Sequence, residues 1–296
     1  MSLRDEITKI INEDIKKAVD KVNPDVIGIS TSDKLREINR LQNTKICKHV
    51  IMKDFGKDPV TIIPVSDIHL GNKGCNIEKF EQILKLIEET PNCYTILMGD
   101  QTETCTKTSV GLGLYDEDFD IKDQIKLLKI ALKPLAEKGK ILGILTGNHE
   151  MRISYLVRLN PAEMVCESLN VPYLGYQGYL CAKVGDQRYH IFASHGSSSG
   201  TTPTGKLSAA RKLNRVADAD IFISGHTHVK LYDQDIIFKI NEATGLVEPT
   251  IRHYIVCGSF VEYWGSYPEM KLLSPASTGS VMIKLSPTTK DVQIML

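Results

Sequence analysis

The stretch Ile141-Leu142-Gly143-Ile144-Leu145-Thr146-Gly147-Asn148-His149-Glu150 decides how this chain folds. Its first five residues are apolar and predict a short buried strand. An amide, an imidazole and a carboxylate follow that strand at three consecutive positions. Because an open α/β sheet binds its ligands outside the carboxyl ends of its strands, these side chains lie where a site is expected. Alone the stretch is a weak signal, and its meaning depends on how the other strands end.

Four further apolar runs end in the same kinds of residue. They are residues 61–66 before Asp67-Ile68-His69, 94–98 before Gly99-Asp100, 189–194 before His195, and 221–224 before Gly225-His226-Thr227-His228. Side chains alternate along an extended chain, so Asp67 and His69 are expected to point the same way, as are His226 and His228. The pattern predicts one cluster of oxygen and nitrogen ligands at the ends of five strands.

Seven candidate metal ligands follow from this pattern: Asp67, His69, Asp100, Asn148, His195, His226 and His228. They are too many for one closed tetrahedral zinc site, and they suit two divalent metals that share a bridging carboxylate. Mixed Asp, Asn and His sites accept manganese, iron or zinc, so we expect two cations of these kinds as cofactors. Scattered histidines would not align with strand ends in this way. His49, His190 and His253 lie outside the motifs and are interpreted as ordinary core or surface residues.

The ordered series Asp-x-His, Gly-Asp, Gly-Asn-His-Glu, His and Gly-His-x-His resembles that of the calcineurin-like metallophosphoesterases. The Gly-Asn-His-Glu-x-Arg arrangement is similar to compact bacterial and phage-borne members. The resemblance implies an α/β fold of the four-layer α/β/β/α sandwich type. The residues themselves support parallel strand–helix–strand units at the front and a strand-rich part after His228. The family often has Asp or Asn where this chain has Glu103, which leaves the contact at that position open.

The resemblance also implies how the metals are held. Asp67, His69 and His228 would hold one metal, and Asn148, His195 and His226 would hold the other. Asp100 would bridge the two. A hydroxide that bridges the metals would then attack phosphorus in line, opposite the leaving group.

Three residues that follow this pattern have expected roles in catalysis. The family pattern points His149 at the leaving group, and a near-neutral pKa would permit it to act as the general acid, beside Asp100 as the catalytic carboxylate. Glu150 would orient a ligand or His149. Arg152 would either hold a substrate phosphate or form a salt bridge with a nearby carboxylate.

The expected function is therefore that of a dinuclear-metal phosphoesterase. A phosphodiesterase acting on nucleic acid or a nucleotide is favoured, and a phosphomonoesterase acting on a nucleotide or a protein is the alternative. A non-catalytic scaffold of the same fold is less favoured because every ligand type is present. A helix expected at residues 206–217 carries Lys206, Arg211, Lys212 and Arg215. Such a run is typical of a solvated face, but beside the metals it would suit a polyanionic substrate.

Composition narrows the remaining choices. Among 296 residues, Lys+Arg and Asp+Glu are 36 each, which argues against gripping nucleic acid by overall charge but not against a local basic patch. No apolar run approaches the roughly 20 residues that span a bilayer, and the first residues do not resemble a signal peptide. The seven cysteines are scattered and form no Cys-x-x-Cys pair. These features predict a cytoplasmic protein with reduced thiols and no membrane partner.

The expected domain organisation is a helical extension over residues 1–60, packed on a metallophosphoesterase domain over residues 61–296. Apolar residues at helical spacing predict a helix over residues 7–22, and a partner-binding or oligomerising helix is the alternative. A second helix is expected at 32–41 and a strand at 47–52. Residues 101–118, 196–205 and 258–279 are expected to be loops. The last contains Trp264 and other aromatic residues, interpreted as packing rather than base stacking.

Overall fold

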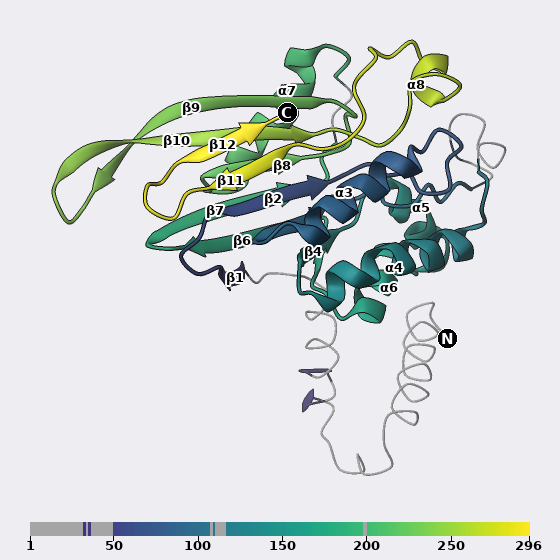
Figure 1. Cartoon of the computed structure of the whole chain (residues 1–296), viewed down its shortest axis with the longest axis horizontal. Coiled ribbons are helices and arrows are strands. Elements are labelled where there is room, and N and C mark those ends of the chain that lie inside the picture. Colours follow the sequence, from purple (N-terminus) through teal and green to yellow (C-terminus); the bar gives the residue numbers. More distant parts are fainter. Residues whose placement is uncertain (1–31, 34, 37–49, 107–108, 110–116, 198–199) are drawn as a thin grey trace, which may run out of the picture. The chain divides into compact units, whose positions relative to one another are not determined.

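The computed structural model describes residues 32–33, 35–36, 50–106, 109, 117–197 and 200–296 (Figure 1). The chain divides into two compact units, Met1–Ile46 and Cys47–Leu296. The helix expected at residues 7–22 lies outside the described residues, as does His49, so the N-terminal helical extension stays a prediction. Residues 32, 33, 35 and 36 are helical, within the helix expected at 32–41.

One sheet of the second unit carries the decisive stretch. Its order is β12-β11-β2-β3-β4-β5. The strands are β2 (Val60–Val65), β3 (Cys93–Leu97), β4 (Ile141–Leu145), β5 (Tyr173–Gly175), β11 (Met282–Leu285) and β12 (Val292–Met295). Strands β2 to β5 are parallel, as their intervening helices predict, while β11 runs antiparallel to both β2 and β12.

The other sheet has the order β1-β6-β7-β8-β10-β9. Its strands are β1 (Val50–Asp54), β6 (Gln177–Val184), β7 (Gln187–Ser194), β8 (Ile221–Ser224), β9 (Lys230–Asn241) and β10 (Leu246–Cys257). The neighbours β7, β8 and β10 are parallel, so the ends of β7 and β8 reach the same edge. Pairs β6–β7 and β9–β10 are antiparallel, and β1 joins β6 in parallel.

Helices cover the outer faces of the two sheets. Helices α3 (Ile77–Glu89), α4 (Ile121–Glu137) and α6 (Pro161–Leu169) lie together over the first sheet (Figure 1). Helix α7 (Pro203–Lys212), continued by a short 3-10 helix (Leu213–Arg215), covers the second sheet. Helix α5 (Asn148–Val157) follows β4, and α8 (Tyr267–Met270) is a single turn. The α/β/β/α sandwich that the sequence predicts is confirmed. No described helix is long and apolar enough to cross a membrane.

Strand geometry explains how three apolar clusters hold the four layers together. Adjacent residues of a strand point to opposite faces. In β2, Ile62 packs between the sheets and Ile63 packs against the helices. In β10, Ile255 packs between the sheets and Tyr254 packs toward α7. The central strands of both sheets are therefore buried on both faces, which fixes the ends of these strands in space.

The start of α7 differs from the sequence expectation. It was expected at Lys206, but the helix begins at Pro203 because the Thr202 side chain accepts a hydrogen bond from Gly205 N and caps it. Proline fits the first helical position, where its missing N–H costs nothing. Lys206 consequently lies in the first turn and is buried, at 6% exposure.

A partly buried lysine, Lys140, joins two layers. Lys140 Nζ, just before β4, donates to the carbonyl oxygens of Ile87 (2.5 Å), Glu88 (2.9 Å) and Thr90 (2.7 Å) at the carboxyl end of α3. These carbonyls lack partners within the helix, and a cation there also opposes the negative end of the helix dipole. Lys140 therefore joins α3 to the strand that leads into the candidate site.

We expect Lys140→Met to lower the free energy of unfolding by about 1–3 kcal/mol, the usual range for hydrogen bonds to a charged group. Urea unfolding followed by circular dichroism measures the change. Lys133→Met is the matched control, since Lys133 is exposed and its contact with Glu137 is 3.7 Å. That control should cost under about 0.5 kcal/mol. Equal effects of the two substitutions would contradict the capping role.

Candidate metal centre

All seven candidate ligands gather where strand ends of both sheets meet. Asp67 and His69 follow β2, Asp100 follows β3, and Asn148 opens α5 after β4. His195 follows β7, and both His226 and His228 follow β8. Asp67, His69, Asp100 and His195 are buried, each at most 4% exposed. The centre therefore depends on the two sheets being packed together.

The candidate ligand atoms form two groups within 4.8 Å, and a third group, His69, Asp100 and His149, shares one residue with each of them. In the first, His228 Nε2 lies 3.2 Å from His69 Nε2 and 3.3 Å from Asp67 Oδ1. The second consists of Asp100, His195 and His226.

In the second group, His195 Nε2 lies 3.2 Å from Asp100 Oδ2 and 3.1 Å from Asn148 Oδ1. Asp100 Oδ2 is also 4.0 Å from His69 Nε2. Asp100 thus stands between the two groups.

The hydrogen bonds around these residues leave the atoms that face the centre available for a cation. Asp67 Oδ2 accepts from His226 N and Ser66 Oγ, whereas the buried Oδ1 has no hydrogen-bond donor among the described residues. His69 Nδ1 contacts Glu103 Oε2 at 2.8 Å, and His195 Nδ1 contacts Met98 O at 2.9 Å. Each ring is thereby oriented with Nε2 toward the centre, as in metal sites. The donor set fits divalent cations.

The charges of the site also favour the binding of cations. Burial alone would lower the pKa of His69, but its hydrogen bond to Glu103 and nearby carboxylates raise that pKa to about 9. Burial opposes a raised pKa at His195 too, yet Asp100 raises it to about 10. Burial would raise the pKa of Asp67, while the contact with His228 lowers it to about 2. The buried carboxylates therefore favour positive charge at their centre.

The backbone at the ligands is left-handed rather than extended. Asp67, His69, Asp100, His226 and His228 have φ between 51° and 69°, and they are half of the ten described non-glycine residues with positive φ. The expectation that the two pairs converge through strand alternation was wrong, because both pairs lie beyond the strands in turns. Such conformations cost energy and gather at functional sites, where surrounding contacts hold them.

Two glycines allow the strand ends to approach one another. A Cβ atom on Gly147 would lie 2.1 Å from Asp100 Oδ1, and one on Gly225 would lie 2.1 Å from Ser66 Oγ. No side chain fits at either position without displacing a candidate ligand or its neighbour. The glycines of the Gly-Asn-His-Glu and Gly-His-x-His motifs are therefore explained by close packing.

Glu103 settles the position that the sequence left open. Its carboxylate binds His69 and lies 3.4 Å from His149 Nδ1, and it accepts a hydrogen bond from Cys105 Sγ at 3.2 Å. Burial would raise the pKa of Glu103, but the bond to His69 lowers it to about 2. Glu103 thus orients a candidate ligand, a role the sequence did not predict.

Glu150 acts on backbone groups rather than on a ligand side chain. Its carboxylate accepts from the N–H groups of Asp100 (3.0 Å), Thr102 (3.0 Å) and Gly147 (2.9 Å). It is 1% exposed, and burial raises its pKa. The expectation that Glu150 orients a ligand or His149 is replaced by this observation: it clamps the loop after β3 to the start of α5.

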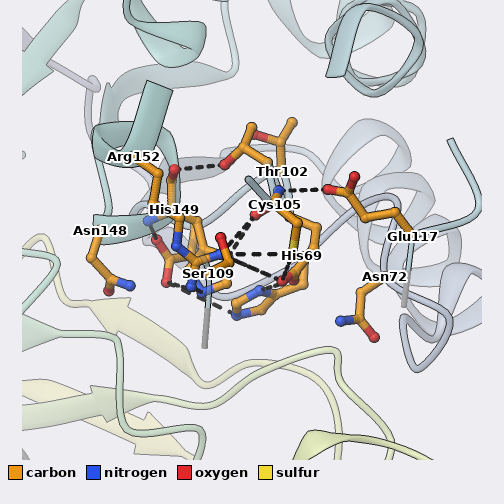
Figure 2. Close-up of polar contacts among 12 residues, drawn as sticks. His69, Asn72, Thr102, Cys105, Ser109, Glu117, Asn148, His149 and Arg152 are labelled. Carbon is orange, nitrogen blue, oxygen red and sulfur yellow. Dashed lines mark hydrogen bonds and ion pairs between the residues drawn. The ribbon is translucent and has the colours of Figure 1, made fainter. Parts of the chain in front are cut away.

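His149 and Arg152 contact each other beside the centre (Figure 2). Arg152 Nη2 lies 2.9 Å from His149 Nε2, while His149 Nδ1 lies 2.7 Å from Glu103 O. A guanidinium only donates, so Nε2 accepts and the proton of the neutral ring is on Nδ1. Burial lowers the pKa of His149 to about 4. The near-neutral pKa expected for His149 is therefore not what its surroundings produce.

Arg152 forms one of the two contacts expected of it, and its binding of a phosphate stays a prediction. Its Nη1 lies 3.7 Å from Glu103 Oε1, which is the expected salt bridge, yet the side chain also lines the cavity over the centre. That cavity has a volume of about 510 Å³. Segment 258–279 contributes Tyr263 and Tyr267 to its wall, whereas Trp264 is 78% exposed and is not part of the lining.

Comparisons with known proteins agree with this geometry. The family model described as calcineurin-like phosphoesterase matches residues 60–230. No curated protein matches the sequence. Among solved structures, a hypothetical protein from Pyrococcus horikoshii OT3 is similar, with 12% identity over 80% of this chain and 87% of that chain. Its TM-score of 0.42 is too low to bear on the fold or the function.

We expect Glu150→Gln to weaken binding of a divalent cation by about 10–100-fold, the range for groups that support metal ligands. Glutamine keeps one acceptor oxygen, but its amide nitrogen cannot accept, so at least one of the three backbone N–H groups loses its partner and the loops are held less firmly. Competition titration with a manganese-sensitive chelator measures the affinity. Glu137→Gln, on an exposed position of α4, is the control. Unchanged affinity in Glu150→Gln would contradict the clamp.

Proposed function

The chain belongs to the calcineurin-like phosphoesterase family, and from this premise we propose that it is a dinuclear-metal phosphodiesterase acting on a nucleic acid or a nucleotide. One observation supports the proposal most strongly. The two groups of candidate ligands lie on either side of Asp100, which lines the cavity. Asp67, His69 and His228 would hold one cation, Asn148, His195 and His226 the other, and Asp100 both. Manganese, iron and zinc all suit this donor set.

Two cations in such a site neutralise phosphoryl charge and lower the pKa of a bound water toward neutrality. The rest of the chemistry depends on residues of the chain. Arg152 is placed to bind the phosphate, because a guanidinium matches two phosphate oxygens and its Nη1 contact with Glu103 Oε1 is long, at 3.7 Å.

His149 is proposed as the group that protonates the leaving oxygen. In the free protein its Nε2 accepts from Arg152 and carries no proton. When Arg152 turns to a substrate phosphate, Nε2 is released toward the cavity. The phosphate's negative charge then favours a proton at Nε2, which can pass to the leaving oxygen. In this proposal, the same movement of Arg152 binds the substrate phosphate and frees His149 Nε2 to take up a proton.

The cavity supports the proposal of a diester rather than a small monoester. Its 510 Å³ exceeds what one phosphate fills, and its lining includes Tyr263, Tyr267 and Leu273. These side chains offer apolar and aromatic surface to the ester groups of a substrate. A cytoplasmic location belongs to the same proposal, since the six described cysteines are free thiols.

We expect hydrolysis of bis(p-nitrophenyl) phosphate to exceed that of p-nitrophenyl phosphate, with manganese required and chelator abolishing turnover. Asp100→Asn should lower kcat by at least about 100-fold because it removes the shared carboxylate. Monoester preference would replace the diesterase by a phosphatase. Absence of metal-dependent turnover, with Asp100→Asn equal to wild type, would favour a non-catalytic scaffold.

We expect His149→Ala to retain its metal but to lose about 10²–10⁴-fold in kcat on a diester with a poorly leaving alkoxide. On the nitrophenyl diester the loss should be much smaller, since nitrophenolate leaves without a proton. Steady-state kinetics on the two substrates, with metal content measured in parallel, test this. His190→Ala is the control, because the His190 side chain is 54% exposed and outside the cavity lining. Equal losses on both diesters would remove His149 from proton transfer.

A further inference from the structure

Lys206 has a largely buried side chain in the wall of the cavity, and no described residue is a counter-ion for it. It is 6% exposed and lines the same cavity as Asp100, Asn148 and His226. Within the described part of the chain, its ammonium has no hydrogen-bond or ion-pair partner, and burial alone lowers its pKa. Because the side chain is held at the wall of the cavity and its ammonium is not among the fully buried polar atoms, the charge is available to an anion in the cavity.

Two other basic residues of the same helix, Arg211 and Lys212, do not line the cavity. Arg211 Nε donates to Asp233 Oδ2 at 2.6 Å, and the guanidinium stacks over Tyr254 at 5.0 Å. Lys212 is exposed. The basic run expected as one solvated face or one binding face is therefore divided, and only Lys206 belongs to the cavity.

The backbone around Lys206 also favours an anion. Lys206 lies in the first turn of α7, and Gly200 and Thr201, which precede that turn, line the cavity with it. The amino-terminal end of a ten-residue helix carries partial positive charge, although Pro203 has no N–H and the N–H of Gly205 is already bound by the Thr202 side chain. Helix end and ammonium therefore present positive charge to the same space.

Lys206 and Arg152 reach the cavity from different layers. Arg152 comes from α5, which follows the first sheet, and Lys206 from α7, which covers the second. They are the two Lys or Arg side chains in the described lining. Arg152 is already assigned to the phosphate that reacts, and Lys206, with no carboxylate beside it, is free for another anion.

We propose that Lys206 and the amino-terminal turn of α7 bind a second phosphate of the substrate, next to the one that is hydrolysed. The inference rests on the proposed phosphoesterase function and makes its substrate class narrower. The substrate is a phosphodiester that carries a neighbouring phosphate, as either the next linkage of a nucleic acid strand or a terminal phosphate of a nucleotide. An isolated diester leaves Lys206 unused.

Three chromogenic substrates test this: thymidine 5′-(p-nitrophenyl phosphate), its 3′-phosphate, and the methyl ester of that 3′-phosphate. We expect the wild-type KM to be lower for the 3′-phosphorylated compounds. Lys206→Met should raise KM about tenfold or more for these compounds, to the value for the parent, with kcat unchanged. Lys206→Arg should keep part of the preference. An effect on the methyl ester identifies a strand, and an effect on the free 3′-phosphate alone identifies a terminal phosphate.

Lys212→Met is the matched control, since it removes the same charge from an exposed position of the same helix. Met keeps the aliphatic stem of Lys206 and removes an uncompensated charge, so the melting temperature should be unchanged or raised by roughly 2–4 °C. A lowered melting temperature together with unchanged KM values would show a structural lysine and overturn the inference. Equal loss of kcat on all three substrates would also overturn it, because Lys206 would then act at the reacting phosphate.

Calorimetry separates this inference from the proposed function. Thymidine 3′,5′-bisphosphate should bind the manganese-loaded wild-type protein about tenfold more tightly than the Lys206→Met variant. Such binding without turnover of any ester would refute the proposed function and support the role of Lys206. Equal affinities of the wild type and the Lys206→Met variant for the bisphosphate would overturn the role of Lys206. The kinetic experiments would then still test the proposed hydrolysis.

Discussion

The burial of Asp100 at the meeting point of two sheets is the constraint on which the site depends. A carboxylate taken out of water costs several kcal/mol unless charges and hydrogen bonds compensate. Asp100 Oδ1 accepts from His149 N at 2.8 Å, and Oδ2 lies 3.2 Å from His195 Nε2. Its pKa is held well below the usual value despite burial, chiefly by the charge of His195. Every neighbouring loop must therefore be positioned to keep this carboxylate ionised.

The loops that satisfy Asp100 also join the layers. Gly225 N donates to His195 O, His226 N donates to Asp67 Oδ2, and His69 N donates to Asp100 O. These bonds connect the ends of β2, β3, β7 and β8 across the two sheets. Because the ligands come from both sheets, cation binding is linked to the packing of the sandwich, and each stabilises the other. The left-handed turns at the ligands are kept by the same bonds.

The candidate metal ligands could be predicted from the sequence because each one follows an apolar run, and such a run predicts a strand. The supporting groups could not be predicted, since they act between positions far apart in the chain. Glu103 binds His69 from 34 residues away, and Glu150 binds Asp100 N from 50 residues away. No local pattern marks such pairs. The start of α7 had a local signal in Thr202-Pro203, but the Gly- and Thr-rich composition around it favoured a loop instead.

The charges of the site indicate that divalent cations bind before a phosphate ester does. The chain has no net charge, so attraction for a polyanion must arise locally. Without cations, Asp100 and Glu103 present negative charge to the cavity, Asp67 adds a fully buried negative charge, and protons on His69 and His195 compensate only in part. A phosphate ester approaching this centre would be repelled. Divalent cations reverse that field by replacing the protons. Arg152 and Lys206 then add attraction at the wall, where they can select the shape of the anion rather than merely its charge.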